Sequence, residues 1–184
     1  MDDPGQANYR RFLEGDESAL FDLVERYNDG LVLYLNSFVG SLAVADELAE
    51  DAFVKLCLKR PRHRGLSSFK TWLYAIGRNL ALDYLRRAAR EKRVPLHEVS
   101  LADGELLESR FLREEQKRRV HRAMSRLKPE YRQTLWLLYF EEMSGKEAAA
   151  VMRKSVHAVE TLAYRARLAL RRELEKEGIA HEDI

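Results

Sequence analysis

Residues 144–172 read SGKEAAAVMRKSVHAVETLAYRARLALRR, a pattern typical of two helices joined by a sharp turn. Ser144 and Glu147 match a capping box, in which the serine hydroxyl accepts from the backbone N–H of Glu147 while the glutamate side chain accepts from the backbone N–H of Ser144. Ser155 can cap a second, longer helix. This order is typical of the helix-turn-helix. An antiparallel helical hairpin within a bundle fits the segment equally well.

The second of these helices has two different faces. Apolar residues recur at helical spacing along one face, at Val159, Leu162, Ala163, Ala166, Leu170 and Leu174. At about 100° per residue, the opposite face carries His157, Thr161, Tyr164, Leu168 and Arg171. The sequence therefore predicts a helix with one buried face and one face available to a ligand such as DNA.

The composition of the whole chain favours helices. Of its 184 residues 46% are hydrophobic and 34% are charged, with nine glycines and four prolines. The single cysteine, Cys57, excludes an intramolecular disulfide and lies in an apolar helical pattern. We expect a cytoplasmic protein without membrane insertion, because we find neither a signal peptide nor an apolar run approaching the roughly 18 residues of a membrane helix.

Charge is distributed unevenly along the chain. Residues 1–58 hold four Lys/Arg against twelve Asp/Glu, whereas residues 59–93 hold eleven Lys/Arg against two Asp/Glu. Residues 94–115 are again acidic, with a net charge of −4, and residues 116–184 are basic, with a net charge of +5. Solvated helix faces would explain charge runs of this kind, but the density of the first basic block favours a nucleic acid, and the acidic blocks favour a basic protein partner.

Further helices are predicted on both sides of a weakly periodic segment. One amphipathic helix runs from Asp16 to Phe38 and stops at Gly40; a second begins near Ser41 and ends before Pro61; a third is capped by Ser68 and runs toward Arg93. Helical pattern returns near Phe111, and Pro129 suits the first turn of the next helix. We expect an all-α chain: a helical domain over residues 1–93 with frayed first residues, a linker over 94–110, a second helical domain over 111–178, and a tail over 179–184.

Four stretches of the chain resemble bacterial RNA polymerase sigma factors of the extracytoplasmic function group. They are ADELAEDAF at residues 45–53, SFKTWLYAIGRNLALDYLRR at 68–87, LKPEYR at 127–132 and AYRARLAL at 163–170. The resemblance covers nearly the whole chain and implies a two-domain factor, the second domain being a winged-helix-like helix-turn-helix domain. The first domain would bind core polymerase and open the minus-ten promoter element, and the second would read the minus-thirty-five element.

The resemblance also implies site residues. A basic surface of core polymerase would meet the carboxylates of Asp46, Glu47, Glu50 and Asp51. Capture of the minus-ten strand would use Arg62, His63, Arg64, Phe69, Lys70, Trp72, Arg78, Asn79, Arg86 and Arg87. For Trp72 a core role is the alternative, because a large aromatic in an amphipathic helix is more often buried than a stacking platform. The minus-thirty-five element would contact Arg153, Lys154, Ser155, His157, Thr161, Tyr164, Arg165 and Arg167. An anti-sigma factor is an expected partner, and no cofactor or metal is expected.

Two positions depart from the family pattern. Glu50 stands where the family often has glutamine, which would alter the polymerase contact. Arg153 stands at the turn where the family often has glycine in a left-handed conformation, so the turn is expected to differ in shape or to carry strain of about 1 kcal/mol.

Other functions fit the residues less well. An enzyme is disfavoured because the five histidines lack metal-ligand spacing and the chain has no glycine-rich phosphate loop. A helix-turn-helix regulator that never engages polymerase is the main alternative, but it would not need residues 68–87 or the acidic helix before them. An adaptor that binds only other proteins is the third possibility.

Overall fold

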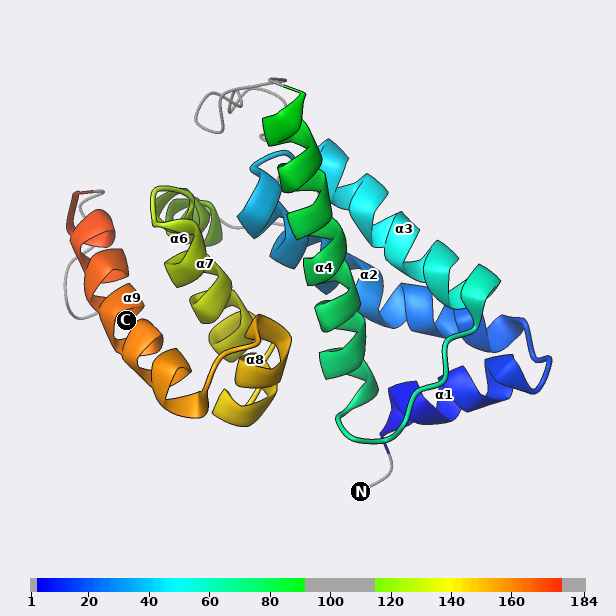
Figure 1. The fold of residues 1–184 in the computed structure, drawn as a ribbon. Helices are drawn as coiled ribbons and strands as arrows, with labels where there is room; N and C mark the ends of the chain where they lie inside the picture. The colour runs from blue at the N-terminus through cyan, green and yellow to red at the C-terminus, as the bar shows by residue number, and fades with distance from the viewer. Residues whose placement is uncertain (1–2, 92–114, 177–184) are drawn as a thin grey trace.

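The computed structural model describes residues 3–91 and 115–176, which fold into helices (Figure 1). The first part contains α1 (Pro4–Leu13), α2 (Ser18–Val39), α3 (Leu42–Lys59) and α4 (Phe69–Arg90). The second contains α6 (Glu115–Ser125), α7 (Pro129–Leu135), the π-helix η1 (Trp136–Phe140), α8 (Gly145–Met152) and α9 (Val156–Lys176). Neither described part contains a strand, so the all-α prediction is confirmed and the helix-turn-helix has no wing there. The predicted linker over 94–110 and tail over 179–184 lie outside the described residues.

Local signals in the sequence begin and end the helices where predicted. The hydroxyls of Ser41 and Ser68 accept from backbone N–H groups three residues on, at 3.4 and 3.2 Å, and begin α3 and α4. Gly40 ends α2 in the left-handed conformation, with φ 67°. Pro129 occupies the first turn of α7.

The expectation of frayed first residues is contradicted from Asp3 onward, because α1 packs against α2 and α4; residues 1–2 lie outside the described residues. Asp3 caps α1 by accepting from the N–H of Gly5 at 3.0 Å, and its other carboxylate oxygen accepts from the N–H of Phe69. Tyr9 is 1% exposed and donates to the carbonyl oxygen of Pro61 at 2.7 Å. An Asp-Pro pair is a helix-start signal, so the sequence did contain the information that predicts α1.

The helix that begins at Pro129 changes to a π-helix at Trp136. The N–H of Glu141 donates to the carbonyl of Trp136 at 3.0 Å, a five-residue step, and the rings of Trp136 and Phe140 stack with centroids 4.4 Å apart. π-Turns of this kind often occur at functional positions. This turn brings the side chain of Glu141 toward the first domain.

The two parts share one continuous hydrophobic core. In the first, α2 packs against α1, α3 and α4; in the second, α9 packs against α6, α7 and α8. Contacts of α4 with α8 and of α2 with α7 join them (Figure 1). The apolar cluster therefore extends from Tyr9 to Ala166. Within the described residues, no helix is both long and apolar enough to span a membrane.

Candidate nucleic-acid and polymerase interfaces

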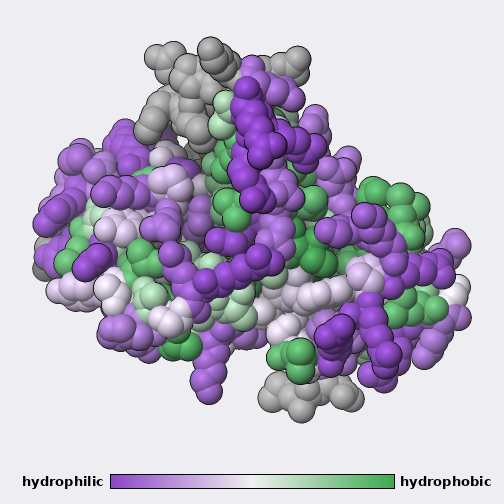
Figure 2. Space-filling model, in the orientation of Figure 1, coloured by the Kyte–Doolittle hydropathy of each residue, from purple (hydrophilic) through white to green (hydrophobic). Residues whose placement is uncertain are grey.

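The helix α4 presents a basic surface along its C-terminal half. Arg86, Arg87 and Arg90 are exposed and, with Asp83, line a shallow surface hollow of about 260 Å³. Arg86 forms an ion pair with Asp83. Figure 2 shows this end of α4 as a hydrophilic band. Exposed cationic groups gathered at one end of a helix suit the phosphates of a nucleic-acid strand.

The loop before α4 forms a second hollow, of about 590 Å³, lined by Arg62, His63 and Arg64. The His63 ring packs against Trp72, with centroids 5.0 Å apart, and against Phe69 at 6.3 Å. Both ring nitrogens of His63 are buried and have no hydrogen-bond partner among the described residues. A hollow lined by an imidazole ring and two arginines can accept part of a nucleic-acid strand, such as a nucleobase with its phosphate.

Phe69 is not a strand-capture residue, contrary to the prediction. Its side chain is fully buried and packs against the rings of Tyr9, Tyr27 and Trp72, with centroids 5.5, 5.6 and 5.8 Å away. No face of the ring remains for a base, because the core of the first domain surrounds it. Trp72 is half-buried against the same cluster, and the centroids of its ring and the Tyr9 ring are 5.4 Å apart.

The three central candidates on α4 occupy different environments. Arg78 and Asn79 are half-buried on α4, and the Nε atom of Arg78 is buried without a hydrogen-bond partner among the described residues. Lys70, by contrast, is already paired: its Nζ lies 2.7 Å from Oε2 of Glu141 and donates to the carbonyl oxygen of Glu141 at 2.8 Å. In this arrangement Lys70 is therefore committed to the second domain and is not free for DNA.

The predicted helix-turn-helix is present over α8 and α9. Both arms of the capping box at Ser144 and Glu147 form, and Ser155 accepts from the N–H of Ala158 at 3.2 Å to begin α9. Arg153 adopts the left-handed conformation, with φ 54° and ψ 46°, so the turn keeps the shape that glycine would favour. Of the two outcomes expected for this position, the structure therefore supports strain and not a changed shape.

The outer face of α9 is available to solvent. His157, Tyr164, Arg165 and Arg167 are exposed, and so are Arg153, Lys154 and Ser155 at the turn. Thr161 is half-buried and donates to the carbonyl oxygen of His157 at 3.0 Å. Two of the cations have protein partners: Arg167 donates to the hydroxyl of Tyr139 at 3.0 Å, and Lys154 lies 3.2 Å from the carboxylate of Glu130.

The acidic candidates lie together on α3. Asp46, Glu47, Glu50 and Asp51 are all exposed, whereas Ala45, Leu48, Ala49 and Ala52 on the other side of the helix are buried. Exposed apolar surface continues from them toward the C-terminal end of α3, where Val54 is 49% and Leu58 78% exposed (Figure 2). A carboxylate cluster beside exposed apolar side chains suits a protein partner that is both basic and apolar.

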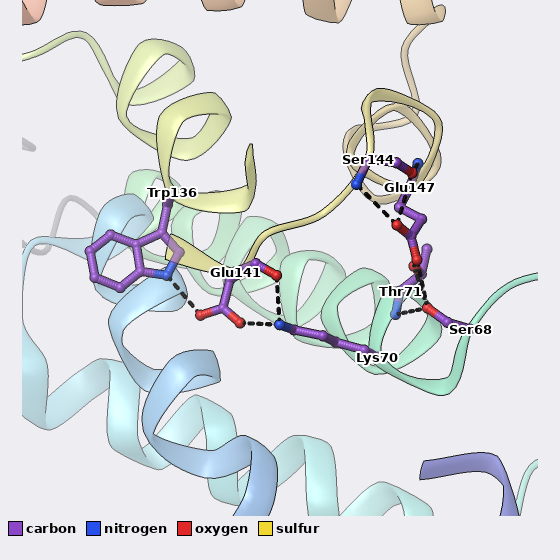
Figure 3. A network of polar contacts seen from close by, with 7 residues as sticks. All are labelled: Ser68, Lys70, Thr71, Trp136, Glu141, Ser144 and Glu147. Carbon is purple, nitrogen blue, oxygen red and sulfur yellow. Dashed lines mark hydrogen bonds and ion pairs between the residues drawn. The ribbon is translucent and has the colours of Figure 1, made fainter. Parts of the chain in front are cut away.

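Sequence reasoning missed a polar network that joins α4 to the second domain (Figure 3). Glu141 accepts from Nε1 of Trp136 at 3.2 Å and pairs with Lys70. Burial raises the pKa of the Tyr74 phenol, and the neighbouring Glu141 carboxylate raises it further. No local signal could have identified the network, because its partners are more than 70 residues apart along the chain. Within the described ranges no group of acidic, histidine or cysteine side chains could hold a metal ion.

Comparisons with known proteins match both parts of the chain. The family model described as Sigma-70 region 2 matches residues 23–91, and the one described as Sigma-70, region 4 matches residues 117–170. The RNA polymerase sigma-H factor of Pseudomonas aeruginosa is 32% identical, and the ECF RNA polymerase sigma-E factor of Escherichia coli is 31% identical. Each alignment covers 90% of this chain and 91% of the relative.

A solved structure, that of CnrH in complex with the cytosolic domain of CnrY, has a TM-score of 0.69 and 26% sequence identity to this chain. It matches over 95% of this chain and 99% of its own. The sigma factor RpoE of Bartonella quintana, solved with the anti-sigma factor NepR, shares the fold with a TM-score of 0.67 at 20% identity, covering 83% of this chain and 94% of its own.

Proposed function

Because the chain belongs to the extracytoplasmic function group of the sigma-70 family, whose members direct promoter-specific transcription initiation by core RNA polymerase, we propose that it acts through three separate surfaces. One surface binds core polymerase, one captures the minus-ten strand, and one reads the minus-thirty-five element. The observation that carries the proposal is the order of an acidic helix, a basic helix and a helix-turn-helix in one chain.

The polymerase surface is the exposed face of α3. Asp46, Glu47, Glu50 and Asp51 supply carboxylates for a basic partner surface, and Val54 and Leu58 extend the contact with apolar side chains. Charge complementarity would set the rate and the register of docking, and the buried apolar area would supply affinity.

The minus-ten surface is the loop before α4 together with the exposed side of α4. Extruding a base costs roughly a few kcal/mol, so the protein must hold the freed base and its backbone. The hollow at Arg62, His63 and Arg64 receives the base, with Trp72 against His63; Asn79, further along α4, contacts the freed strand, and Arg78, Arg86 and Arg87 hold phosphates. Lys70 joins them only when it is released from Glu141.

The minus-thirty-five surface is the turn and outer face of the helix-turn-helix. His157, Thr161, Tyr164 and Arg165 face outward from α9 and reach base edges, while Arg153, Lys154, Ser155 and Arg167 hold the backbone. The proposed partners are core polymerase, promoter DNA and an anti-sigma factor in the cytoplasm, and the chain itself would carry out no enzymatic reaction. The anti-sigma partner is supported by the structural relative RpoE, which was solved with the anti-sigma factor NepR.

Run-off transcription tests this function. Core polymerase supplied with the chain should initiate from a cognate promoter, and the double variant Asp46→Asn/Glu47→Gln should need about tenfold more protein for half-maximal transcript, an estimate that assumes roughly 1.4 kcal/mol of lost interaction. A matched control is Glu25→Gln/Asp29→Asn, which removes two exposed carboxylates from α2. Tight binding to duplex DNA without polymerase, and no transcript, would indicate the helix-turn-helix regulator instead.

A further inference from the structure

We propose that a polar latch between α4 and residues 141–147, together with the apolar contacts between the two parts, holds the free chain in a closed form that is unable to engage both promoter elements. The latch consists of Ser68, Lys70 and Thr71 on one side and Glu141 and Glu147 on the other (Figure 3). We further propose that Lys70 exchanges Glu141 for a DNA phosphate when the latch opens. This inference rests on the proposed function, which requires both domains to contact one promoter.

The first half of the latch is a partly desolvated ion pair. Glu141 has only 9% of its side chain exposed and Lys70 has 30%, and two contacts join them, one to the carboxylate and one to the backbone carbonyl. Trp136 donates to the second carboxylate oxygen at 3.2 Å. A carboxylate at this depth is stable only while it is paired, so loss of Lys70 would expel it from its site.

The first domain leaves space for the Glu141 carboxylate beside Gly30. A Cβ atom built at Gly30 on α2 would lie 2.6 Å from Oε1 of Glu141 and 2.6 Å from the Tyr74 hydroxyl. Only the absence of a side chain at Gly30 leaves room for both groups. This space is therefore formed by α2 and α4 of the first domain, and the Glu141 side chain of the second domain occupies it.

The second half of the latch involves Glu147, which also caps the beginning of α8. Glu147 closes the capping box of α8 by accepting from the N–H of Ser144 at 3.0 Å, and its other oxygen accepts from the hydroxyls of Ser68 at 3.1 Å and Thr71 at 3.4 Å. Ser68 is itself the N-cap of α4. The first helix of the helix-turn-helix and the beginning of the minus-ten helix are thus capped by one connected set of hydrogen bonds.

The spacing of promoter elements makes this closed arrangement incompatible with full promoter binding. Elements centred near minus ten and minus thirty-five are about 25 base pairs apart, roughly 85 Å along B-form DNA. A compact chain of this length is only about 40 Å across. Since α4 packs against α8 at the start of the helix-turn-helix, the two DNA-binding surfaces cannot reach both elements until the domains separate.

Opening would also complete the minus-ten surface. Lys70 lies on α4 one turn before Tyr74 and two turns before Arg78, yet its ammonium group is occupied by Glu141 in the closed form. Glu141 and a phosphate therefore compete for one cation. Contact with single-stranded DNA and closure of the latch oppose each other.

Distance measurements between spin labels on the full chain test the latch. Labels are placed on Glu25→Cys in α2 and Glu160→Cys in α9, both exposed positions, in a Cys57→Ala background. The parent should give one short, narrow distance distribution. Glu141→Lys should shift it to longer distances, and so should the near-isosteric Glu141→Gln, which guards against a folding defect. The controls are Glu142→Lys and Glu142→Gln, at the exposed neighbouring position, and both should give the same distance distribution as the parent.

Binding of a single-stranded oligonucleotide carrying the minus-ten sequence, without polymerase, tests the exchange. Glu141→Gln should bind about tenfold more tightly than the parent, because the apparent affinity scales with the open fraction. Unchanged distances in both Glu141 variants, or a parent that is already broad and long, would overturn the latch. Longer distances with no gain in affinity would overturn the exchange at Lys70. The distances require no DNA, so failure of the parent chain to direct transcription would refute the proposed function and leave the latch standing.

Discussion

The guanidinium group of Arg132 on α7 donates to the carbonyl oxygen of Ser37 on α2 twice, from Nε at 3.0 Å and from Nη2 at 2.7 Å. Its Nη1 also donates to the carbonyl oxygen of Ser125, the last residue of α6, at 2.7 Å. Both carbonyls lie in last turns of helices, where they lack helical partners and carry partial negative charge. A single arginine therefore caps two helices from different domains.

Replacing Arg132 should destabilise the chain. Arg132→Ala should lower the free energy of unfolding by about 2 kcal/mol, because a charged hydrogen-bond donor is lost at the part-buried carbonyl of Ser37 and at the exposed carbonyl of Ser125. Arg132→Lys should recover only part of the loss, since one ammonium group cannot reproduce the planar fork. Urea denaturation followed by circular dichroism measures the difference, with the exposed Lys128→Ala as control. Equal midpoints for Arg132→Ala and Lys128→Ala would contradict the capping role.

Phe69 should behave as a core residue. Phe69→Ala should cost about 3 to 5 kcal/mol of stability, because it empties the centre of the aromatic cluster. Leu66→Ala, at a neighbouring side chain that is 88% exposed, is the control and should cost far less. Thermal unfolding of the purified variants measures both. A stable Phe69→Ala protein that fails only in open-complex formation would restore the DNA-contact role.

Arg153→Gly should separate stability from DNA binding. Glycine relieves the left-handed strain at φ 54°, so the free energy of unfolding should rise by about 1 kcal/mol. The same change removes a proposed phosphate contact, so the log–log salt slope of promoter binding by the holoenzyme should fall by about 0.9. Thermal unfolding and promoter-binding titrations at several salt concentrations measure the two effects. A lowered melting temperature would contradict the strain.

Asn79→Ala and Arg78→Ala should weaken open-complex formation more than initial promoter binding. Both residues are half-buried on α4, the helix that carries the proposed strand-capture surface, and this surface engages DNA only after the strands separate. Permanganate footprinting of the minus-ten region reports the melted thymines, and a mobility-shift assay reports initial binding. Arg10→Ala removes an exposed cation from α1 and serves as the control. Permanganate reactivity equal to that of the parent would argue against this division of roles.

The capping carboxylate of Glu147 should make stability depend on pH in the acid range. Burial raises the pKa of this carboxyl, but the hydrogen bonds from Ser144, Ser68 and Thr71 outweigh burial and lower it below its ordinary 4.5. A carboxyl whose pKa is lower in the folded state stabilises the fold above the ordinary pKa, and this contribution is lost as the pH falls through the folded-state pKa. Unfolding free energies measured from pH 7 down to about pH 3 should therefore fall less steeply for Glu147→Gln than for the parent. Parallel curves would contradict the expectation.

The ends of the helices could be predicted from the sequence because their signals are local. Ser41, Ser68 and Ser144 each accept from a backbone N–H three residues on. Gly40 ends α2 because a glycine can adopt a positive φ without a clash. The apolar stripes and the segregation of charge are likewise properties of neighbouring residues. These features determined an all-α chain, its helix-turn-helix and the grouping of its acidic and basic surfaces.

Only the tertiary structure decided which side chains on those helices remain available. An apolar stripe does not reveal what covers it, so Phe69 could be taken for a DNA contact until α1 and α2 were seen to enclose it. Lys70 is one more cation in the sequence, but 71 residues later along the chain the π-turn brings Glu141 against it. Pairings over such separations depend on how whole helices pack, and local spacing contains no information about that.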